Sequence, residues 1–412
     1  GMLVAEAAMD ELAHAAGIDA LEFRKRNLYA PGRDITPYHQ KIEQPILLDL
    51  MTTLEAQTDY QVRQAAARAF NAQHTQFKKG LALTPVQFGI SFTVTHLNQA
   101  GALVNIFKDG SVEVNHAGTE MGQGLYTKIQ QIAAEALGVE AEQIVPCATQ
   151  TDKVPNGSPT AASSGSDLNG MAVLNACEKL KSRLVGFLQE NHDWPVAPVV
   201  FADGKIACES LSMDFNEAIK LAYLARVSLS ATGFYKTPEI HFDKVAGRGQ
   251  AFYYFAYGAA VSEVIIDTLT GEYRVLRVDI LHDAGASLNP AVDLGQIEGG
   301  FIQGMGWLTT EELLWNDDGV LISNSPANYK IPAAGDCPAE FNVALYQHEN
   351  PKPTIYRSKA TGEPPLMLAI STWCALRDAC SAVSDYKVLP PLAVPATPEA
   401  VFWSVQAARG EQ

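Results

Sequence analysis

The chain has 412 residues, of which 47% are hydrophobic and 18% are charged, and its formal net charge is −16. This length and composition indicate a folded chain with two or more domains, or one very large domain, rather than a disordered chain. The acidic charge disfavours nucleic acid and anionic membrane surfaces as partners, because phosphates repel it. We therefore expect a well-hydrated surface and neither of these two partners.

The six cysteines give no indication of a metal centre. No two of them have Cys-x-x-Cys spacing, so we expect no iron–sulfur cluster or zinc ion on this chain and assign no metal ligand. Without a dense disulfide framework the chain suits a reducing cytoplasm, and nearly all six cysteines should be buried small apolar side chains. No apolar run approaches the roughly 18 residues of a membrane span, and no signal-peptide pattern is visible.

The first part of the chain is expected to be helical. An apolar stripe over residues 3–16 predicts a helix that ends at Gly17, and a capping-box pattern at Asp19 begins a second helix. Residues 29–46 have the composition of a connector, and residues 49–72 continue the helical pattern. Because the first residues are already helix-like, we expect the chain to begin inside a structure rather than ahead of one.

Strand patterns begin near residue 81 and alternate irregularly with helical ones. The strand-rich segments are 81–94, a hairpin over 102–115 with a type I′ turn at Asp109-Gly110, a second hairpin at Asp203-Gly204, 227–235, and 256–281 with a turn at Thr270-Gly271. The expected helices are 125–137, 166–190, 214–225, 293–308 and Pro364 to about Val383. The absence of regular βαβ alternation predicts an α+β fold with mixed sheets, not a Rossmann sheet.

A glycine-flanked polar segment, Gly-Thr-Glu-Met-Gly-Gln-Gly, occupies residues 118–124. Glycines let the backbone approach a ligand closely, and Gln123 offers a donor and an acceptor on one side chain. A plain turn before a helix is the alternative interpretation. The segment lacks the Lys-Ser/Thr ending of a nucleoside-triphosphate loop.

A second small, hydroxyl-rich segment lies at residues 156–165 and leads into a helix. Its N–H groups and hydroxyls suit an anionic or heterocyclic ligand, and a solvated loop with a Ser or Thr cap is the alternative. In the third segment, residues 359–366, Glu363 lies between a glycine and a Pro-Pro helix start. It is either a simple helix cap or a base, and a base needs burial to raise its pKa.

Five short motifs, in this order, resemble the xanthine dehydrogenase and oxidase family of molybdenum hydroxylases. They are Phe-Gly-Ile-Ser-Phe-Thr at 88–93, Gly-Thr-Glu-Met-Gly-Gln-Gly at 118–124, Ser-Pro-Thr-Ala-Ala-Ser at 158–163, Gly-Phe-Ile-Gln-Gly at 300–304 and Gly-Glu-Pro-Pro-Leu at 362–366. The resemblance covers essentially the whole chain and is closest to the C-terminal part of the bacterial molybdopterin-binding large subunit. It implies that residues 1–75 are the mostly helical tail of a first molybdenum-cofactor-binding domain and that residues 76–412 are the second.

The resemblance implies a role for each matching residue. The implied contacts to the molybdenum-pterin (molybdopterin) cofactor are Gly122, Gln123, Thr160, Ala161, Ala162, Ser163 and Gln303. Phe92 is implied as one of two rings that sandwich a purine, with Thr93 as its polar neighbour; without the family, Phe92 is a strand core residue. Glu363 is implied as the catalytic base that takes a proton from a molybdenum-bound hydroxide.

The resemblance also implies partners. In the family, a second aromatic wall, a substrate arginine, a Gly-Gly-Phe-Gly cofactor loop and a second substrate glutamate precede the part that this sequence matches. We therefore expect the N-terminal half of the molybdenum subunit to complete the site, and an apolar surface that this half covers to promote oligomers. The [2Fe–2S] clusters and FAD of the family are expected on a partner chain.

The implied function is oxidation of xanthine or hypoxanthine within a larger cytoplasmic enzyme, of which this chain alone is inactive. Hydroxylation of an aldehyde or another N-heterocycle remains open, because the residues that select the substrate lie upstream. A fragment that folds without binding the cofactor is the third alternative, since half of the family's cofactor site is absent from this sequence.

Overall fold

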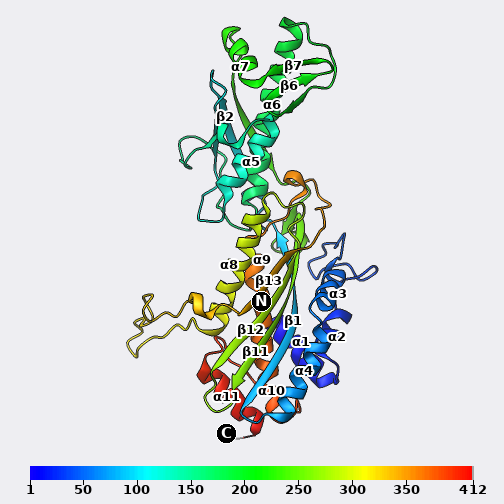
Figure 1. The fold of residues 1–412 in the computed structure, drawn as a ribbon, viewed down its shortest axis with the longest axis vertical. Helices are drawn as coiled ribbons and strands as arrows, with labels where there is room; N and C mark the ends of the chain where they lie inside the picture. The colour runs from blue at the N-terminus through cyan, green and yellow to red at the C-terminus, as the bar shows by residue number, and fades with distance from the viewer. Residues whose placement is uncertain (411–412) are drawn as a thin grey trace.

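The computed structural model describes residues 1–410 and has two lobes along its long axis (Figure 1). We call residues 95–236 the distal lobe and the rest the sheet lobe. The helices of the sheet lobe are α1 (Met2–Ala16), α2 (Ala20–Arg26), α3 (Leu47–Gln57), α4 (Tyr60–Gln73), α8 (Pro290–Thr309), α9 (Pro364–Leu368), α10 (Ile370–Ser381) and α11 (Pro398–Arg409). Its strands are β1 (Phe77–Ile90), β9 (His241–Asp243), β10 (Arg248–Gln250), β11 (Tyr254–Asp267), β12 (Tyr273–His282) and β13 (Glu340–Leu345).

A four-stranded sheet in the order β1-β11-β12-β13 forms the centre of the sheet lobe. β1 and β11 pair antiparallel along their whole length, whereas β13 joins β12 in parallel. Alternate residues of β1 enter different cores: Ala82 and Val86 pack with α8 and α10, and Leu81 and Leu83 pack with α3. The period of two thus places one helical layer on each face of the sheet.

Two glycines allow helices to lie directly on strands. A Cβ on Gly80 in β1 would come within 1.9 Å of the Ala375 carbonyl oxygen of α10. In the distal lobe, a Cβ on Gly233 would come within 1.8 Å of the Ala172 carbonyl oxygen. Any side chain at either position would push a helix away from its sheet.

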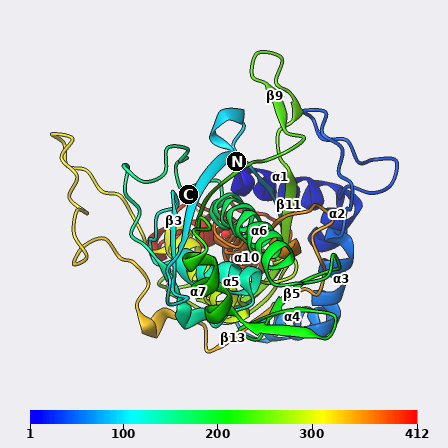
Figure 2. The same ribbon diagram turned by 90° about the horizontal axis from the view of Figure 1, so that it is seen from above.

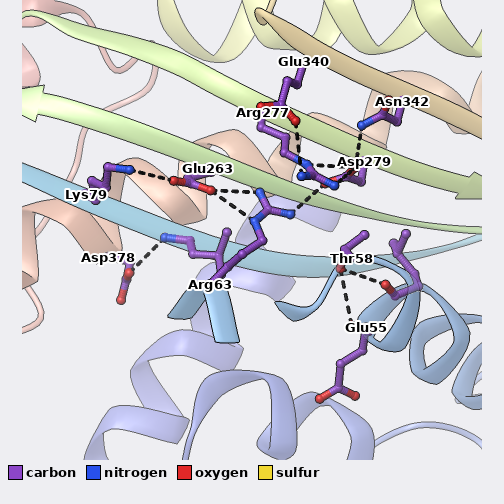
Figure 3. A network of polar contacts seen from close by, with 12 residues as sticks. Glu55, Thr58, Arg63, Lys79, Glu263, Arg277, Asp279, Glu340, Asn342 and Asp378 are labelled. Atoms are coloured by element: carbon purple, nitrogen blue, oxygen red, sulfur yellow. Dashed lines mark hydrogen bonds and ion pairs between the residues drawn. The ribbon is translucent and has the colours of Figure 1, made fainter. Parts of the chain in front are cut away.

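A network of ion pairs joins α4 to three strands of the sheet (Figure 3). Arg63 contacts Glu263 of β11 at 3.0 Å and Asp279 of β12 at 2.8 Å. Asp279 also accepts hydrogen bonds from Arg277 and from Asn342 of β13. A shift of α4 would separate Arg63 from its carboxylates and leave poorly solvated charges unpaired. The network therefore fixes the position of α4 on the sheet.

The distal lobe contains α5 (Leu125–Leu137), α6 (Gly165–Asn191), α7 (Phe215–Leu224), β2 (Gln99–Ile106), β3 (Val112–His116), β4 (Ile144–Pro146), β5 (Val200–Ala202), β6 (Lys205–Cys208), β7 (Leu211–Asp214) and β8 (Ser230–Lys236). Its main sheet has the order β4-β3-β2-β8, and α5 and α6 share one core with it. The strands β5-β6-β7 form a small second sheet beside α7. Seen along the long axis, α5 and α6 lie over α10 of the sheet lobe (Figure 2).

The predicted α+β class is confirmed, since helices and several mixed sheets make up both lobes. Gly17 ends α1 in the left-handed conformation, as predicted, and the Asp19 carboxylate caps α2. The helix expected over 49–72 is two helices, and the helix expected after Pro364 is also interrupted, at Ala369. The predicted boundary at 75/76 falls between α4 and β1, and the division into two domains stays a prediction.

Three details differ from the sequence-based expectations. The turn at Asp109-Gly110 is not type I′, because only Gly110 has positive φ, whereas Asp203 and Gly204 both do. β13 and α11 had not been predicted. In β13 only every second residue is partly buried, and α11 begins after a Thr397 cap with proline at its first position.

The cysteines and the apolar segment also need correction. All six cysteines are free thiols, but Cys337 is exposed and Cys147 is only half-buried. Taken together across the interruption at Ala369, the helical segment Pro364–Ser384 has the length and hydropathy of a membrane span, contrary to the expectation. However, 78% of its most apolar window is buried inside the protein, so in this structure it is a core helix between the sheet and its neighbouring helices.

Candidate functional site

The three glycine-flanked segments meet at the junction of the lobes, around one cavity of about 260 Å³. The distal lobe contributes the start of α5 and the loop before α6, and the sheet lobe contributes the start of α8 and the loop before α9. The cavity residues that carry polar side chains are Gln123, Lys128, Thr160, Ser163, Ser166, Asp167, Asp293, Gln296, Ser358, Lys359, Thr361 and Glu363. Segments 158–163 and 362–366, far apart in sequence, are therefore neighbours in space.

Glu120 organises the first loop. Its carboxylate accepts hydrogen bonds from the backbone N–H groups of Gly122 at 2.8 Å, Gly124 at 3.1 Å and Tyr126 at 2.9 Å. Burial tends to raise the pKa of Glu120, but these donors outweigh burial and hold its pKa below the usual value. Glu120 is thus a structural anion at the start of α5.

Gln123 also stabilises this loop. Its Oε1 accepts from the Met121 N–H at 2.5 Å, and its Nε2 donates to the Thr119 carbonyl at 2.7 Å. Gly122 has φ of 96°, which favours glycine, and the space where a Cβ would project is open. The loop therefore offers accessible backbone beside the Gln123 amide, as a polar heterocyclic ligand requires.

The second loop is tied to both of the others. Thr160 Oγ1 accepts from the Thr119 N–H at 2.9 Å. Ala162 and Ser163 have φ of 54° and 56°, an uncommon left-handed conformation for non-glycine residues that is often found at functional sites. Ser163 Oγ donates to Glu363 Oε2 at 2.9 Å and accepts from the Glu363 N–H at 2.8 Å.

Glu363 lies where two hollows meet. It lines the 260 Å³ cavity and also an adjoining hollow of about 410 Å³, whose other walls include Phe88, Ala162, Phe252 and Phe255. Glu363 precedes α9, but its carboxylate does not cap that helix, so the simple-cap interpretation is wrong. Contrary to the expected burial, the side chain is exposed in this chain.

Buried charges form the floor of the cavity. Lys128 of α5 contacts Asp293 of α8 at 2.5 Å, and Asp293 also accepts from the hydroxyls of Ser287 at 2.5 Å and Thr361 at 2.8 Å. Lys359 forms an ion pair with Asp283. Of these contacts, the Lys128–Asp293 ion pair joins the two lobes, and the others lie within the sheet lobe.

Asp167 is a further carboxylate of the cavity, in the first turn of α6. It accepts a hydrogen bond from the Tyr254 hydroxyl at 2.7 Å. Burial raises the pKa of Asp167 to about 7, although the Tyr254 hydrogen bond and Lys128 lower it. Sequence reasoning did not identify Asp167, Lys128 or Asp293, because an acid in a first helical turn and a lysine within a helix are common helix features.

Five residues implied by the resemblance do not line this cavity, namely Gly122, Ala162, Gln303, Phe92 and Thr93, although Ala162 lines the adjoining hollow. Gln303 is exposed on α8, two turns beyond Gln296, which does line the cavity. Phe92 and Thr93 follow the end of β1 in a loop that Asn98 holds through the Phe92 backbone. Phe92 is half-buried, Thr93 is exposed, and Phe92 is not the strand residue considered as the alternative.

A family model described as molybdopterin cofactor-binding domain matches residues 53–338. The chain belongs to this family. It is 46% identical over 407 residues to a xanthine dehydrogenase/oxidase of Felis catus and 45% identical over 400 residues to a xanthine dehydrogenase of Calliphora vicina. These matches cover 97% and 95% of this chain but only 29% and 28% of the relatives, so the chain spans less than a third of their length.

Solved structures share the fold. Quinoline 2-oxidoreductase of Pseudomonas putida 86 superposes with a TM-score of 0.82 at 25% identity, covering 98% of this chain and 52% of that chain. The CO dehydrogenase of Oligotropha carboxidovorans gives a TM-score of 0.83 at 20% identity, covering 98% of this chain and 51% of that one. Family membership is shown by the family model and by the relatives, and the predicted resemblance to the xanthine dehydrogenase and oxidase family of molybdenum hydroxylases is confirmed.

The residues at the lobe junction fit such a cofactor. The Gln123 amide and the hydroxyls of Thr160 and Ser163 provide donors and acceptors around one cavity, and the open backbone at Gly122 lies next to Gln123. The cavity of about 260 Å³ is smaller than the roughly 300–1,000 Å³ of typical ligand pockets. It has room for part of a large cofactor only, and other walls would have to hold the remainder.

Proposed function

We propose that this chain is part of a cytoplasmic molybdenum hydroxylase that oxidises xanthine or hypoxanthine with oxygen derived from water. The observation that carries the proposal is the reciprocal hydrogen-bonded pair between Ser163 and Glu363 at the lobe junction. It joins the loop proposed for the pterin to the carboxylate proposed as the base. The relatives named xanthine dehydrogenase support the purine substrate.

When bound, the molybdenum-pterin cofactor supplies the redox chemistry of the hydroxylation. Gln123 and the backbone at Gly122 would hold it from the distal lobe, together with Thr160, Ala161, Ala162 and Ser163. We also propose roles in cofactor binding for Gln303 and in purine stacking for Phe92, beside Thr93. All three need another wall of the site, since none of them lines the cavity.

Ser163 orients the proposed base. The Ser163 hydroxyl has one hydrogen, and its oxygen already accepts from the Glu363 N–H, so the hydrogen points to Glu363 Oε2. Oε1 has no hydrogen-bond partner among residues 1–410 and remains available to accept a proton. Glu363 would take up the proton that the attacking oxygen loses, with Ser163 fixing the carboxylate plane.

The proposal includes partners. The chain spans less than a third of the xanthine dehydrogenases that it matches, so the remaining walls of the site, the [2Fe–2S] clusters and FAD would come from other polypeptide segments. Oxidation of another N-heterocycle is the second candidate, because quinoline 2-oxidoreductase has the same fold at 25% identity. An aldehyde hydroxylase remains a third.

The test is to co-express this chain with the N-terminal part of a relative's molybdenum subunit and its electron-accepting partner. Molybdenum content, and incorporation of isotopically labelled water oxygen into xanthine, quinoline and an aldehyde, are then measured. We expect stoichiometric molybdenum in the complex, little in the chain alone, and labelled product from xanthine. A complex that folds without molybdenum would identify a non-catalytic chain, and labelled product from quinoline or the aldehyde alone would overturn the purine assignment.

A further inference from the structure

The segment that carries Glu363 is held by four successive contacts to other elements. They are the Lys359–Asp283 ion pair, the Ala360 N–H on the Tyr254 hydroxyl at 2.9 Å, Thr361 Oγ1 on Asp293 at 2.8 Å, and Glu363 on Ser163 at 2.9 Å. The backbone itself is held by a side chain at two of these positions: the Ala360 N–H donates to Tyr254 Oη, and the Glu363 N–H donates to Ser163 Oγ. The side chain at Ala360 leads to a second carboxylate.

The hydrogens at this contact have one arrangement. The Ala360 N–H donates to Tyr254 Oη, so the tyrosine hydrogen is free to donate to Asp167 Oδ2 at 2.7 Å. Asp167 of α6 thus reaches the Glu363 segment through one buried ring of β11, which is only 5% exposed. The chain of contacts crosses from the distal lobe to the sheet lobe.

We infer that Asp167, acting through Tyr254, is a positioning residue for the Glu363 segment and holds it more tightly when its carboxylate is ionised. An ionised acceptor strengthens the hydrogen bond from Tyr254, and that polarises Tyr254 Oη into a better acceptor for the Ala360 N–H. Asp167 lines the same cavity as Glu363, so a charged group in that cavity would interact with both carboxylates. The inference rests on the proposed function only in taking Glu363 as the base.

The charged neighbours of Asp167 support a change of state near neutral pH. Lys128 of α5, Glu363 and Lys359 line the same cavity as Asp167, and Tyr254 of β11 donates to it. The phenols of Tyr235 and Tyr253 are also close enough to interact with its charge. Burial raises the pKa of Asp167 to about 7, against the lowering effects of Tyr254 and Lys128. Asp167 is therefore mainly ionised above about pH 7 and mainly protonated below it. The stronger hydrogen bond at the Ala360 N–H should follow the ionised form.

Amide hydrogen exchange at Ala360, measured on the full chain, tests the inference without cofactor or turnover. Tyr254→Phe removes the acceptor and should speed exchange at Ala360 about fivefold to tenfold, the loss of one typical hydrogen bond. Tyr253→Phe is the matched control: it lies next along the chain, is similarly buried, and its hydroxyl has no partner among the described residues. Its exchange at Ala360 should equal that of wild type.

The pH arm uses Asp167→Asn, whose amide oxygen still accepts from Tyr254 but cannot ionise. In wild type, protection of Ala360, corrected for intrinsic exchange, should rise about threefold between pH 6 and pH 8, consistent with a stronger charged hydrogen bond. In Asp167→Asn it should stay flat. Equal exchange in Tyr254→Phe and Tyr253→Phe, or a retained pH dependence in Asp167→Asn, would overturn the inference.

The proposed hydroxylase activity is tested independently of this inference. Failure of the exchange experiment leaves molybdenum loading and turnover untouched, because neither enters the measurement. Failure to load molybdenum leaves the exchange result valid for the chain. If Tyr254→Phe does not fold, the Asp167→Asn comparison still decides the inference.

Discussion

Ser163 and Glu363 lie 200 residues apart in sequence and form two hydrogen bonds with each other. The serine hydroxyl donates to the glutamate carboxylate and accepts from the glutamate backbone N–H. One residue belongs to the distal lobe and the other to the sheet lobe. The close approach of their chains is aided by Gly362, where a Cβ would come within 3.2 Å of Ser163 Oγ. The pair therefore links lobe packing to the orientation of one carboxylate.

Ser163→Ala should loosen that carboxylate without removing it. Both hydrogen bonds are lost, so turnover in a complete enzyme should fall by about tenfold, since correct positioning of a catalytic group accounts for a large part of the rate. The KM should change less than kcat, because no substrate contact is removed. Steady-state kinetics at matched molybdenum content would show it, and equal kcat in Ser163→Ala and wild type would refute the orienting role.

Gly80→Ala should destabilise the sheet lobe. The new methyl group would meet the Ala375 carbonyl at 1.9 Å, and α10 would have to move off β1. Overpacking of this kind costs about 1–3 kcal/mol, and contact with backbone places Gly80 at the upper end. Urea denaturation should show the loss as a lower midpoint.

Gly186→Ala is the matched control for that substitution. Gly186 lies inside α6, and apart from the neighbouring residues and the backbone of its own helix no atom lies within 4 Å of the Cβ position. Alanine should therefore stabilise the chain by up to about 1 kcal/mol through helix propensity. Opposite signs for the two glycines would support the packing argument, whereas a loss at both positions would contradict it.

Gln123→Ala should lower cofactor occupancy in a reconstituted enzyme. It removes a proposed hydrogen bond to the cofactor and also the two contacts by which Gln123 holds its own loop. Gln123→Glu keeps an acceptor for the Met121 N–H but loses the donor. Elemental analysis should therefore rank molybdenum content as wild type, then Gln123→Glu, then Gln123→Ala. A molybdenum content in Gln123→Ala equal to that of wild type would show that Gln123 does not contribute to cofactor binding.

Acid should destabilise the chain through His282. Its ring is fully buried at the end of β12, and neither nitrogen has a partner among the described residues. Burial lowers the pKa of His282 to about 4, with Asp293 opposing and Lys359 assisting. The unfolded chain then binds the proton more readily, so stability present near pH 7 is lost as pH falls from about 6.5 towards 4.

The predicted size of that loss is about 2 kcal/mol between pH 7 and pH 5 for this one group. His282→Leu cannot titrate and should show a correspondingly smaller loss, measured by urea denaturation at both pH values. His96→Leu, at an exposed position, should behave as wild type. The same loss in His282→Leu and wild type would assign the acid sensitivity to other groups.

Local patterns in the sequence predicted most of the fold. The cap at Asp19, the left-handed Gly17 and the hairpin at Asp203-Gly204 depend on neighbouring residues alone, and all three are present. The interruption at Ala369 and the addition of β13 to β12 depend on packing between distant segments. Periodicity contains no information of that kind.

The candidate site was predictable only in part, for the same reason. Motif order brought Gln123, Ser163 and Glu363 into one hypothesis, and the structure places all three around one cavity. Asp167 and Tyr254 lie 87 residues apart and carry no motif, so their hydrogen bond emerges only from the tertiary structure. The exposure of Glu363 could not be predicted either, since it depends on which walls surround the cavity.

Glu363→Gln is the sharpest test of the proposed chemistry. The amide keeps the shape of the side chain and still accepts from Ser163 through its oxygen, so loop geometry, molybdenum content and substrate binding should be retained. An amide cannot take up the proton, and general-base catalysis contributes about 10²–10⁴ in rate. Turnover in a complete enzyme should fall by at least that range.

Two comparisons make that result specific. Glu190→Gln changes an exposed carboxylate near the far end of α6, about 37 Å along the helix from its first residue at 1.5 Å per residue, and should leave turnover unchanged. The acidic limb of the pH–rate profile, if it reports Glu363, should disappear from the residual activity of Glu363→Gln. Because Glu120 is held by three backbone donors as a structural anion, it is a poor substitute base. If Glu363→Gln turned over within a few-fold of wild type at matched molybdenum content, the base would have to be sought elsewhere, beginning with Asp167 in the same cavity.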